Sequence, residues 1–116
     1  MTVERFEVRE LPDQSRYVLI DHGPDGTLSK EIGEVSYVDV GDERVLFHTG
    51  VSDEYSGQGL ASKLVRAVVD DVVAAGRRIV PVCPYVAAWL PKHPEYADHV
   101  AERRSEHGAA VKALTR

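Results

Sequence analysis

A short turn with two glycines is the part of the sequence best suited to bind a ligand. Ser56-Gly57-Gln58-Gly59-Leu60-Ala61 lies where an extended run, Arg44 to Val51, gives way to an amphipathic helix. At a helix start, backbone N–H groups lack intrahelical partners and the helix dipole adds partial positive charge, which favours phosphate or pyrophosphate. Gly57 and Gly59 have no Cβ and would let a ligand approach the backbone. We therefore predict an anion site, although the motif alone is equally compatible with a tight turn that binds nothing.

The segment after the turn has the pattern of a helix with one buried face. Its apolar residues recur every four positions and form a stripe: Leu60, Leu64, Val68 and Val72. Gly76 is placed to end the helix in a left-handed conformation. On the polar face, Lys63 and Arg66 lie in the N-terminal half, where the dipole disfavours positive charge. One of them is expected to meet a bound anion; the alternative is a pair between Arg66 and Asp70.

Composition limits the class of protein. The 116 residues, 43% of them hydrophobic, are enough for one domain with its own core. A single cysteine excludes an intrachain disulfide and a zinc site of clustered cysteines, and no histidine or carboxylate pair has metal-binding spacing, so we predict no metal. With no apolar leader and no membrane-length apolar run, we expect a cytoplasmic protein that does not bind a membrane.

Charge is unevenly distributed along the chain. The net charge is −5, with 5 basic and 12 acidic residues from Met1 to Asp53, and 9 basic and 7 acidic from Glu54 to Arg116. An acidic chain is a poor binder of nucleic acid, which needs clustered Lys and Arg. The split favours an anionic ligand on the C-terminal half and a cationic one near the N-terminal half, where Glu31, Glu34 and Asp39 are candidates.

The order of elements predicts a mixed α/β protein. Four extended runs precede the turn: 3–8, 16–21, 32–40 and 44–48, the last two joined as a hairpin at Gly41. Three elements follow the long helix: an apolar strand at 78–83, a short helix at 84–90 and a last helix at about 94–104. Pro81 cannot donate to a ladder, so its strand should lack a partner on one side. We assign residues 1–106 to a single domain and treat 107–116 as a candidate mobile tail.

With the glycine turn between the fourth strand and the long helix, the chain resembles the GNAT superfamily of N-acetyltransferases, in particular its small single-domain members. In that superfamily a [Q/R]-x-x-G-x-[G/A] turn binds the pyrophosphate of acetyl-CoA. Gly59 and Ala61 match the last two fixed positions, whereas Ser56 stands where Gln or Arg is usual. The stronger match lies downstream, in Val80-Pro81-Val82-Cys83-Pro84-Tyr85-Val86, Trp89-Leu90 and His93-Pro94-Glu95-Tyr96. Together with His48-Thr49-Gly50-Val51, the resemblance covers roughly Ile32 to Val100.

The resemblance implies a GNAT-like fold: a mostly antiparallel mixed sheet, splayed between its fourth and fifth strands, with flanking helices. The pantetheine arm of acetyl-CoA would enter the gap, which would also explain Pro81, and the thioester would lie beside Cys83. The residues implied to bind the cosubstrate are Thr49, Gly50, Val51, Ser56, Gly57, Gln58, Gly59, Leu60, Ala61 and Lys63.

The implied activity is acetyl-CoA-dependent transfer of an acetyl group to an amine, either a small molecule or a protein lysine. Cys83 could protonate the departing thiolate or accept the acetyl group, and could equally be a small core residue. Tyr85 could act as an acid or merely pack. His93 and His48 titrate near neutral pH and could act as bases, although structural roles at a helix start and a strand end are simpler. Because no residue is an unambiguous base, a CoA-binding module without catalysis is the alternative.

Overall fold

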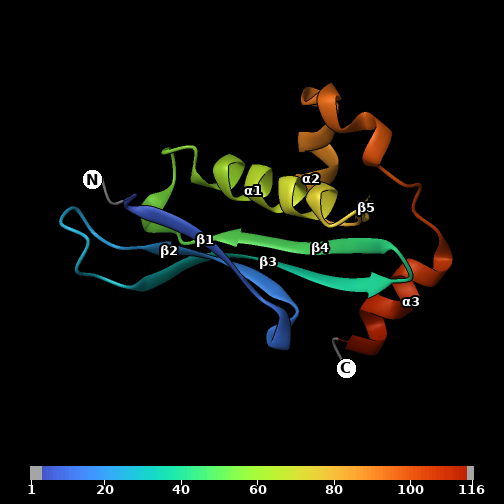
Figure 1. Cartoon of the computed structure of the whole chain (residues 1–116), viewed down its shortest axis with the longest axis horizontal. Coiled ribbons are helices and arrows are strands. Elements are labelled where there is room, and N and C mark those ends of the chain that lie inside the picture. Colours follow the sequence, from blue (N-terminus) through green and yellow to red (C-terminus); the bar gives the residue numbers. More distant parts are fainter. Residues whose placement is uncertain (1–3, 115–116) are drawn as a thin grey trace.

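One five-stranded sheet forms the centre of the protein (Figure 1). The computed structural model describes residues 4–114. The strands, in both sequence and spatial order, are β1 (Phe6–Leu11), β2 (Arg16–Asp21), β3 (Lys30–Val40), β4 (Glu43–Val51) and β5 (Arg78–Pro81). Neighbours from β1 to β4 pair antiparallel, whereas β5 runs parallel to β4. This is the mixed sheet that the sequence predicts. The first strand begins later than expected, and Val3, where it was expected to begin, lies outside the described residues.

Helices cover both faces of the sheet. The helices of the described chain are α1 (Leu60–Ala74), α2 (Pro84–Trp89) and α3 (Ser105–Leu114), with short 3₁₀ turns at Pro12–Gln14, Asp53–Tyr55, Leu90–Lys92 and Pro94–His99. Figure 1 shows α1 and α2 on one face and α3 on the other. The connection from β4 to β5 passes through α1, so the start of α1 follows closely after the end of β4.

The apolar stripe of α1 packs on the sheet. Leu64, Val68 and Val72 are at most 1% exposed, and they share a core cluster with Leu19 of β2 and Leu46 of β4. Complete burial of such a side chain stabilises the fold by about 1.5–3 kcal/mol, which fixes this face of the helix against the strands. Ala75 is the C-cap, and the next residue, Gly76, has a φ of +74°, as the sequence predicts.

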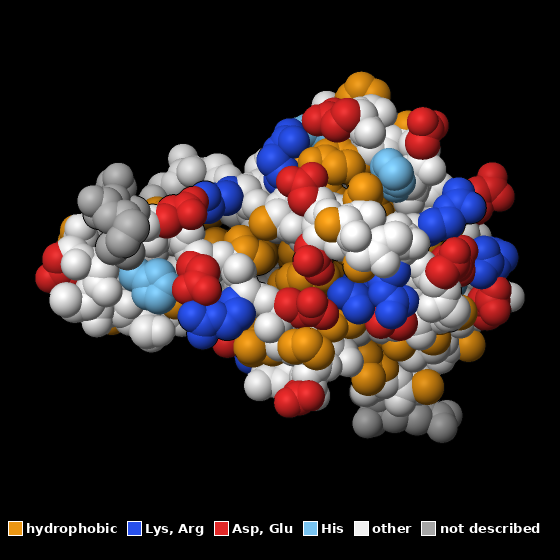
Figure 2. Space-filling view, in the orientation of Figure 1, with side chains coloured by type: hydrophobic (Ala, Val, Ile, Leu, Met, Phe, Trp, Pro, Cys, Tyr) orange, Lys and Arg blue, Asp and Glu red, His pale blue; other side chains and the backbone are white. Residues whose placement is uncertain are grey.

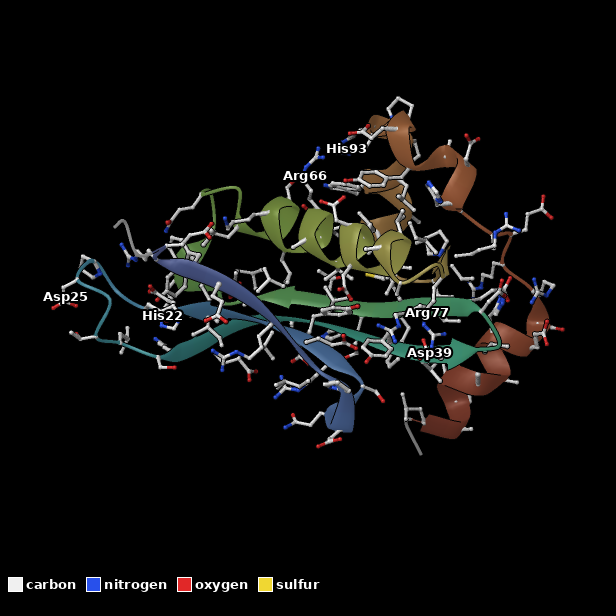
Figure 3. The ribbon with its side chains drawn as sticks, in the orientation of Figure 1. His22, Asp25, Asp39, Arg66, Arg77 and His93 are labelled. Carbon is white, nitrogen blue, oxygen red and sulfur yellow. The ribbon has the colours of Figure 1, made fainter. Side chains whose placement is uncertain are left out.

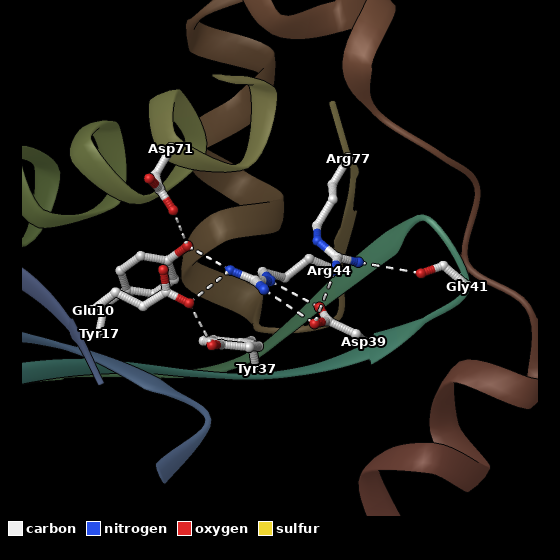
Figure 4. A network of polar contacts seen from close by, with 8 residues as sticks. All are labelled: Glu10, Tyr17, Tyr37, Asp39, Gly41, Arg44, Asp71 and Arg77. Atoms are coloured by element: carbon white, nitrogen blue, oxygen red, sulfur yellow. Dashed lines mark hydrogen bonds and ion pairs between the residues drawn. The ribbon is translucent and has the colours of Figure 1, made fainter. Parts of the chain in front are cut away.

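A buried arginine ties the C-terminal half of α1 to the sheet (Figure 4). Arg44 of β4 donates to both carboxylate oxygens of Asp39, at 2.8 and 3.0 Å, and to the hydroxyl of Tyr17 at 2.8 Å. Tyr17 in turn donates to Asp71 of α1 at 2.6 Å. Because a buried charge is tolerated only when paired and hydrogen-bonded, this network fixes α1 in one position over the strands.

The fourth and fifth strands separate partway along β4, as predicted. Their paired residues end at Leu46 and Pro81, whereas β4 runs on to Val51 beside β3. The backbone N–H of Cys83 donates to the Leu46 carbonyl at 2.8 Å, which is where the chain leaves β5 for α2. Beyond Leu46, β4 therefore has a strand neighbour on one side only within residues 4–114. Pro81 lies on the edge strand, where a missing N–H is tolerated.

The predicted helix at about 94–104 is wrong. Residues Pro94–His99 form a 3₁₀ turn, and the next α-helix begins only at Ser105. Between them the backbone bonds to the sheet instead, since Val100 bridges to Ile79 and the Ala101 N–H donates to the Ile79 carbonyl at 2.8 Å. Tertiary pairing with the edge strand has overridden the local helix signal.

The domain extends past the boundary expected at residue 106. Helix α3 continues through Leu114, and its His107 is fully buried in contact with Glu43 at 2.8 Å. The His107 ring accepts from the Arg104 N–H at its other nitrogen, so the nitrogen facing Glu43 carries the hydrogen. Bonds from Arg104 and His107 lower the pKa of the Glu43 carboxyl from 4.5 to about 2. Residues 107–114 therefore belong to the folded part of the chain; the last two residues of the expected tail lie outside the described residues.

Candidate functional site

A cavity of about 340 Å³ lies where β4 ends and α1 begins. Its walls come from β4, the connection to α1, the first turn of α1 and the first turn of α2. The lining residues are Thr49, Gly50, Val51, Ser52, Tyr55, Ser56, Gly57, Gly59, Leu60, Ala61, Ser62 and Tyr85. The volume falls within the range of small-molecule sites, about 300–1,000 Å³. The cavity therefore joins the segment of β4 that has no β5 partner to the start of a helix.

The glycine turn has the backbone geometry of an anion site. Gly57 and Gly59 have φ of +79° and +71°, a region that is strained for residues with a Cβ. Gly59 is the N-cap of α1 and provides no capping side chain. A Cβ built on either glycine would meet no heavy atom within 4 Å, so the space beside this backbone is open. The first N–H groups of α1 can therefore donate hydrogen bonds to an anionic oxygen of a ligand.

Most of the predicted cosubstrate-binding residues line this cavity. Thr49, Gly50 and Val51 lie on one side and the turn and helix start on the other. Gln58 and Lys63 are not among the lining residues, although both adjoin it in sequence.

Of the three predicted catalytic residues, Tyr85 lines the cavity and is 40% exposed. Cys83 is 5% exposed and lies behind the wall, where its Sγ donates to Thr49 Oγ1 at 3.3 Å. The thiol thus contacts a cavity residue without itself lining the cavity.

His93 lies outside the cavity. Its ring stacks on Trp89 at 3.6 Å, with an angle of 13° between the planes, and its Nδ1 bonds the Trp89 carbonyl at 2.8 Å. Figure 3 shows His93 on the α2 side of the molecule, near Arg66. Trp89 Nε1 donates to Ser62 Oγ at 2.9 Å, and Ser62 lines the cavity. His93 therefore contacts the cavity wall only indirectly, through Trp89.

Neither basic residue of α1 is turned into the cavity. Lys63 pairs with Glu4 at 2.8 Å, an ion pair in which both side chains are substantially exposed. Arg66 donates to the Tyr96 hydroxyl at 3.2 Å and lies over the Trp89 ring. The alternative Arg66–Asp70 pair is replaced by a bond from Tyr96 to Asp70 at 2.5 Å. That bond and burial raise the pKa of Tyr96, burial having the larger effect.

Sequence reasoning missed Ser52, Tyr55 and Ser62, which complete the wall. Ser62 lies on the first turn of the predicted helix and could have been included by position alone. Tyr55 gave no signal, because its partner is remote in sequence: its hydroxyl donates to Asp21 of β2 at 2.5 Å. Donation by Arg5 and then Tyr55 holds the pKa of Asp21 well below its usual range.

A comparison with protein families shows to which family the chain belongs. The family model described as GCN5-related N-acetyl-transferase matches residues 19–99. The chain belongs to this family. The matched segment contains β3, β4, α1, β5 and α2, and therefore every residue that lines the cavity.

A solved structure agrees with this GCN5-related assignment. A GCN5-like candidate N-acetyltransferase from Staphylococcus aureus is 26% identical, with a TM-score of 0.62 over 90% of this chain and 97% of that one. The ribosomal-protein-S18-alanine N-acetyltransferase from Escherichia coli is 23% identical over 67% of this chain and 42% of its own, with a TM-score of 0.47 that carries no weight here. No curated protein matches the chain.

The surface of this GCN5-related domain carries mixed charge. On the face shown in Figure 2, basic side chains lie beside acidic ones. Ion pairs between exposed side chains occur along the chain; Arg9, for example, pairs with Glu7 at 3.0 Å. Within residues 4–114, no group of three or more His, Cys, Asp or Glu side chains has the geometry to hold a metal ion. None of the helices described has the length and apolar character needed to cross a membrane.

Proposed function

We propose that this GCN5-related protein transfers the acetyl group of acetyl-CoA to an amine in the cytoplasm. The observation that carries the proposal is the cavity that joins the unpaired side of β4 to a glycine N-cap. A helix start with no capping side chain provides donors for a diphosphate, and a strand edge provides donors and acceptors for the amide groups of pantetheine.

The residues divide into two sets. The backbone of Gly57 to Ala61 would hold the diphosphate. Thr49, Gly50 and Val51 would contact the pantetheine along β4. Both sets of contacts use backbone groups, which agrees with the absence of Lys or Arg among the residues that line the cavity.

Bound acetyl-CoA supplies a thioester carbonyl carbon to an attacking neutral amine. A C–N bond forms, the C–S bond breaks, the amine nitrogen loses one proton and the sulfur gains one. Tyr85 is proposed to provide the proton to the sulfur, because its hydroxyl belongs to an exposed side chain in the cavity wall. Cys83 is proposed to hold Thr49 in position through its Sγ bond.

A second cavity beside β4 supports an amine as the acceptor. This cavity, of about 270 Å³, shares Gly50, Val51 and Ser52 with the first and is also lined by Glu31 and Glu34. Carboxylates beside a cavity favour binding of an amine that arrives as a cation and gives one proton to water before it attacks in its neutral form. Each of the three acidic candidates already faces an arginine. Glu31 and Glu34 lie 2.7 and 3.8 Å from Arg16, and Asp39 pairs with Arg44, so a cationic acceptor has to compete with these pairs.

Turnover tests the proposal. The protein is incubated with acetyl-CoA and a panel of primary amines and lysine peptides, and release of free CoA thiol is measured, with Gly59→Glu as the control that places charge against the diphosphate. We expect release that depends on the amine and is lost in the variant.

Thermal melting separates the remaining outcomes. CoA at about a hundredfold excess over its Kd should stabilise the fold by about 2.7 kcal/mol. Stabilisation without release across the panel would indicate a CoA-binding module instead. No stabilisation would contradict the proposal altogether.

A further inference from the structure

Tyr55 connects the wall of the cavity with the glycine turn, and no sequence motif indicates this role. Its side chain lines the cavity, and it ends the 3₁₀ turn Asp53–Tyr55 directly before Ser56 and the glycine turn. Its backbone N–H donates to the Ser52 carbonyl at 2.9 Å. Any displacement of Tyr55 would therefore displace the next residues, which form the predicted diphosphate site.

The hydroxyl of Tyr55 is attached to a buried carboxylate in the sheet. The Asp21 side chain is 1% exposed and accepts at both oxygens. Tyr55 donates to its Oδ2 at 2.5 Å, while Arg5 Nε and the Gly23 N–H donate to Oδ1 at 2.9 and 2.7 Å. A second bond from Arg5, from Nη2 to Oδ2 at 3.3 Å, brings the donors to four. A buried carboxylate held in this way has little freedom to reorient, because each lost bond would leave charge uncompensated.

The tyrosine ring has a packing partner as well. It meets the ring of Phe6 edge to face, with centroids 6.3 Å apart and planes at 89°. The other end of this short segment is fixed as well, since the Ser52 N–H donates to the Ile32 carbonyl of β3 at 2.7 Å. Residues 52–55 are thus fastened to β1, β2 and β3 before the chain enters the glycine turn.

We infer that Asp21 and Tyr55 are positioning residues that fix the glycine turn of the cavity for its diphosphate ligand. The inference rests on the proposed function and adds to it a residue on β2 that does not itself line the cavity. Gly57 and Gly59 give the turn its conformation but also leave it free to move, since glycine fixes no dihedral angle. The Asp21–Tyr55 bond supplies the missing restraint.

The test compares two tyrosines with the same kind of bond. Tyr55→Phe removes one hydroxyl and keeps the ring against Phe6. Tyr37→Phe is the matched control, because Tyr37 donates to Glu10 at 2.6 Å and does not line the cavity. Binding of CoA and of pantetheine, which lacks the diphosphate, is measured by calorimetry. We expect Tyr55→Phe to weaken CoA about tenfold, or about 1.4 kcal/mol, and pantetheine by less than about twofold.

Hydrogen exchange of the ligand-free protein provides a second measurement. Tyr55→Phe should speed exchange in residues 52–61 and leave 84–89 unchanged, whereas Tyr37→Phe should leave exchange in both segments unchanged. Equal weakening of both ligands, or an unchanged exchange rate in 52–61, would overturn the inference while CoA binding by the wild type still supported the proposed function. A wild type that binds neither ligand would instead overturn the proposed function, and the inference with it.

Discussion

Replacing Gly59 with alanine separates the cost of a backbone conformation from the loss of a ligand site. The residue has a φ of +71°, and a Cβ there would meet no heavy atom within 4 Å. The free protein therefore gains no clash, and the cost is that of placing an L-residue in the left-handed region, about 1–2 kcal/mol. For a chain of this size we expect the Tm to fall by about 4 °C per kcal/mol.

Gly41 provides a matched control. It lies in the hairpin between β3 and β4 with a φ of +60°, and its added Cβ would also meet nothing within 4 Å. Gly41→Ala should therefore lower the Tm by a similar amount. Gly41 does not line the cavity, so this substitution should leave the binding site unchanged. Any difference between the two variants in CoA affinity would then come from the site and not from stability.

Affinity for CoA, measured by calorimetry well below both melting temperatures, is the deciding assay. We expect Gly59→Ala to weaken CoA at least about tenfold, because a methyl group would stand between the ligand and the first N–H groups of α1. Gly41→Ala should bind as the wild type does. Equal affinities in all three proteins, with similar losses of Tm, would show that the glycine serves the turn alone and that the diphosphate does not approach it.

Substitutions at four further residues test other contacts. Cys83→Ser should keep the bond to Thr49 and normal turnover, while Cys83→Ala should raise the KM for acetyl-CoA; an acetyl adduct on Cys83 by mass spectrometry would show a nucleophile instead. Because the pKa of Glu43 is lowered to about 2, its contribution to stability is complete above pH 4.5 and lost as the pH falls toward 2. Thermal melts over this range should therefore show a steeper loss for the wild type than for Glu43→Gln, and parallel curves would contradict this. Lys63→Ala should weaken CoA more than dephospho-CoA, with a difference that shrinks in high salt, whereas Arg66→Ala should lower the Tm and leave both affinities unchanged.

The sequence predicted those features that depend on neighbours in the chain. The helix after the glycine turn followed from apolar residues four apart, and Gly76 ended it through its own conformational freedom. The separation of β4 from β5 followed from Pro81 together with the family resemblance, because a residue without an N–H suits an edge strand. In each case a few residues carry the information, and packing against the rest of the chain does not reverse it.

Contacts between remote segments could not be predicted in this way. Tyr55 and Asp21 are 34 positions apart, and His107 and Glu43 are 64 positions apart. Nothing in the pattern around any of these residues distinguishes it from an ordinary surface polar residue. The bonds form because the sheet brings β2 beside the start of the glycine turn and α3 against the start of β4, and that arrangement exists only once the strands have paired.

For the basic residues of α1 the electrostatic argument was sound, but it did not identify their partners in the structure. A cation near a helix start does oppose the dipole, and a bound anion is one way to compensate it. The structure gives both residues other partners: Lys63 pairs with Glu4 before β1, and Arg66 pairs with Glu95 at 3.5 Å and bonds to Tyr96 beyond α2. The exposed Lys63 pair is worth at most about 1 kcal/mol, so Lys63 can exchange Glu4 for a ligand phosphate at little cost. Arg66, which also lies over the faces of Trp89 and Tyr96, would have to give up all of these contacts, and it is therefore held in the structure rather than available to the ligand.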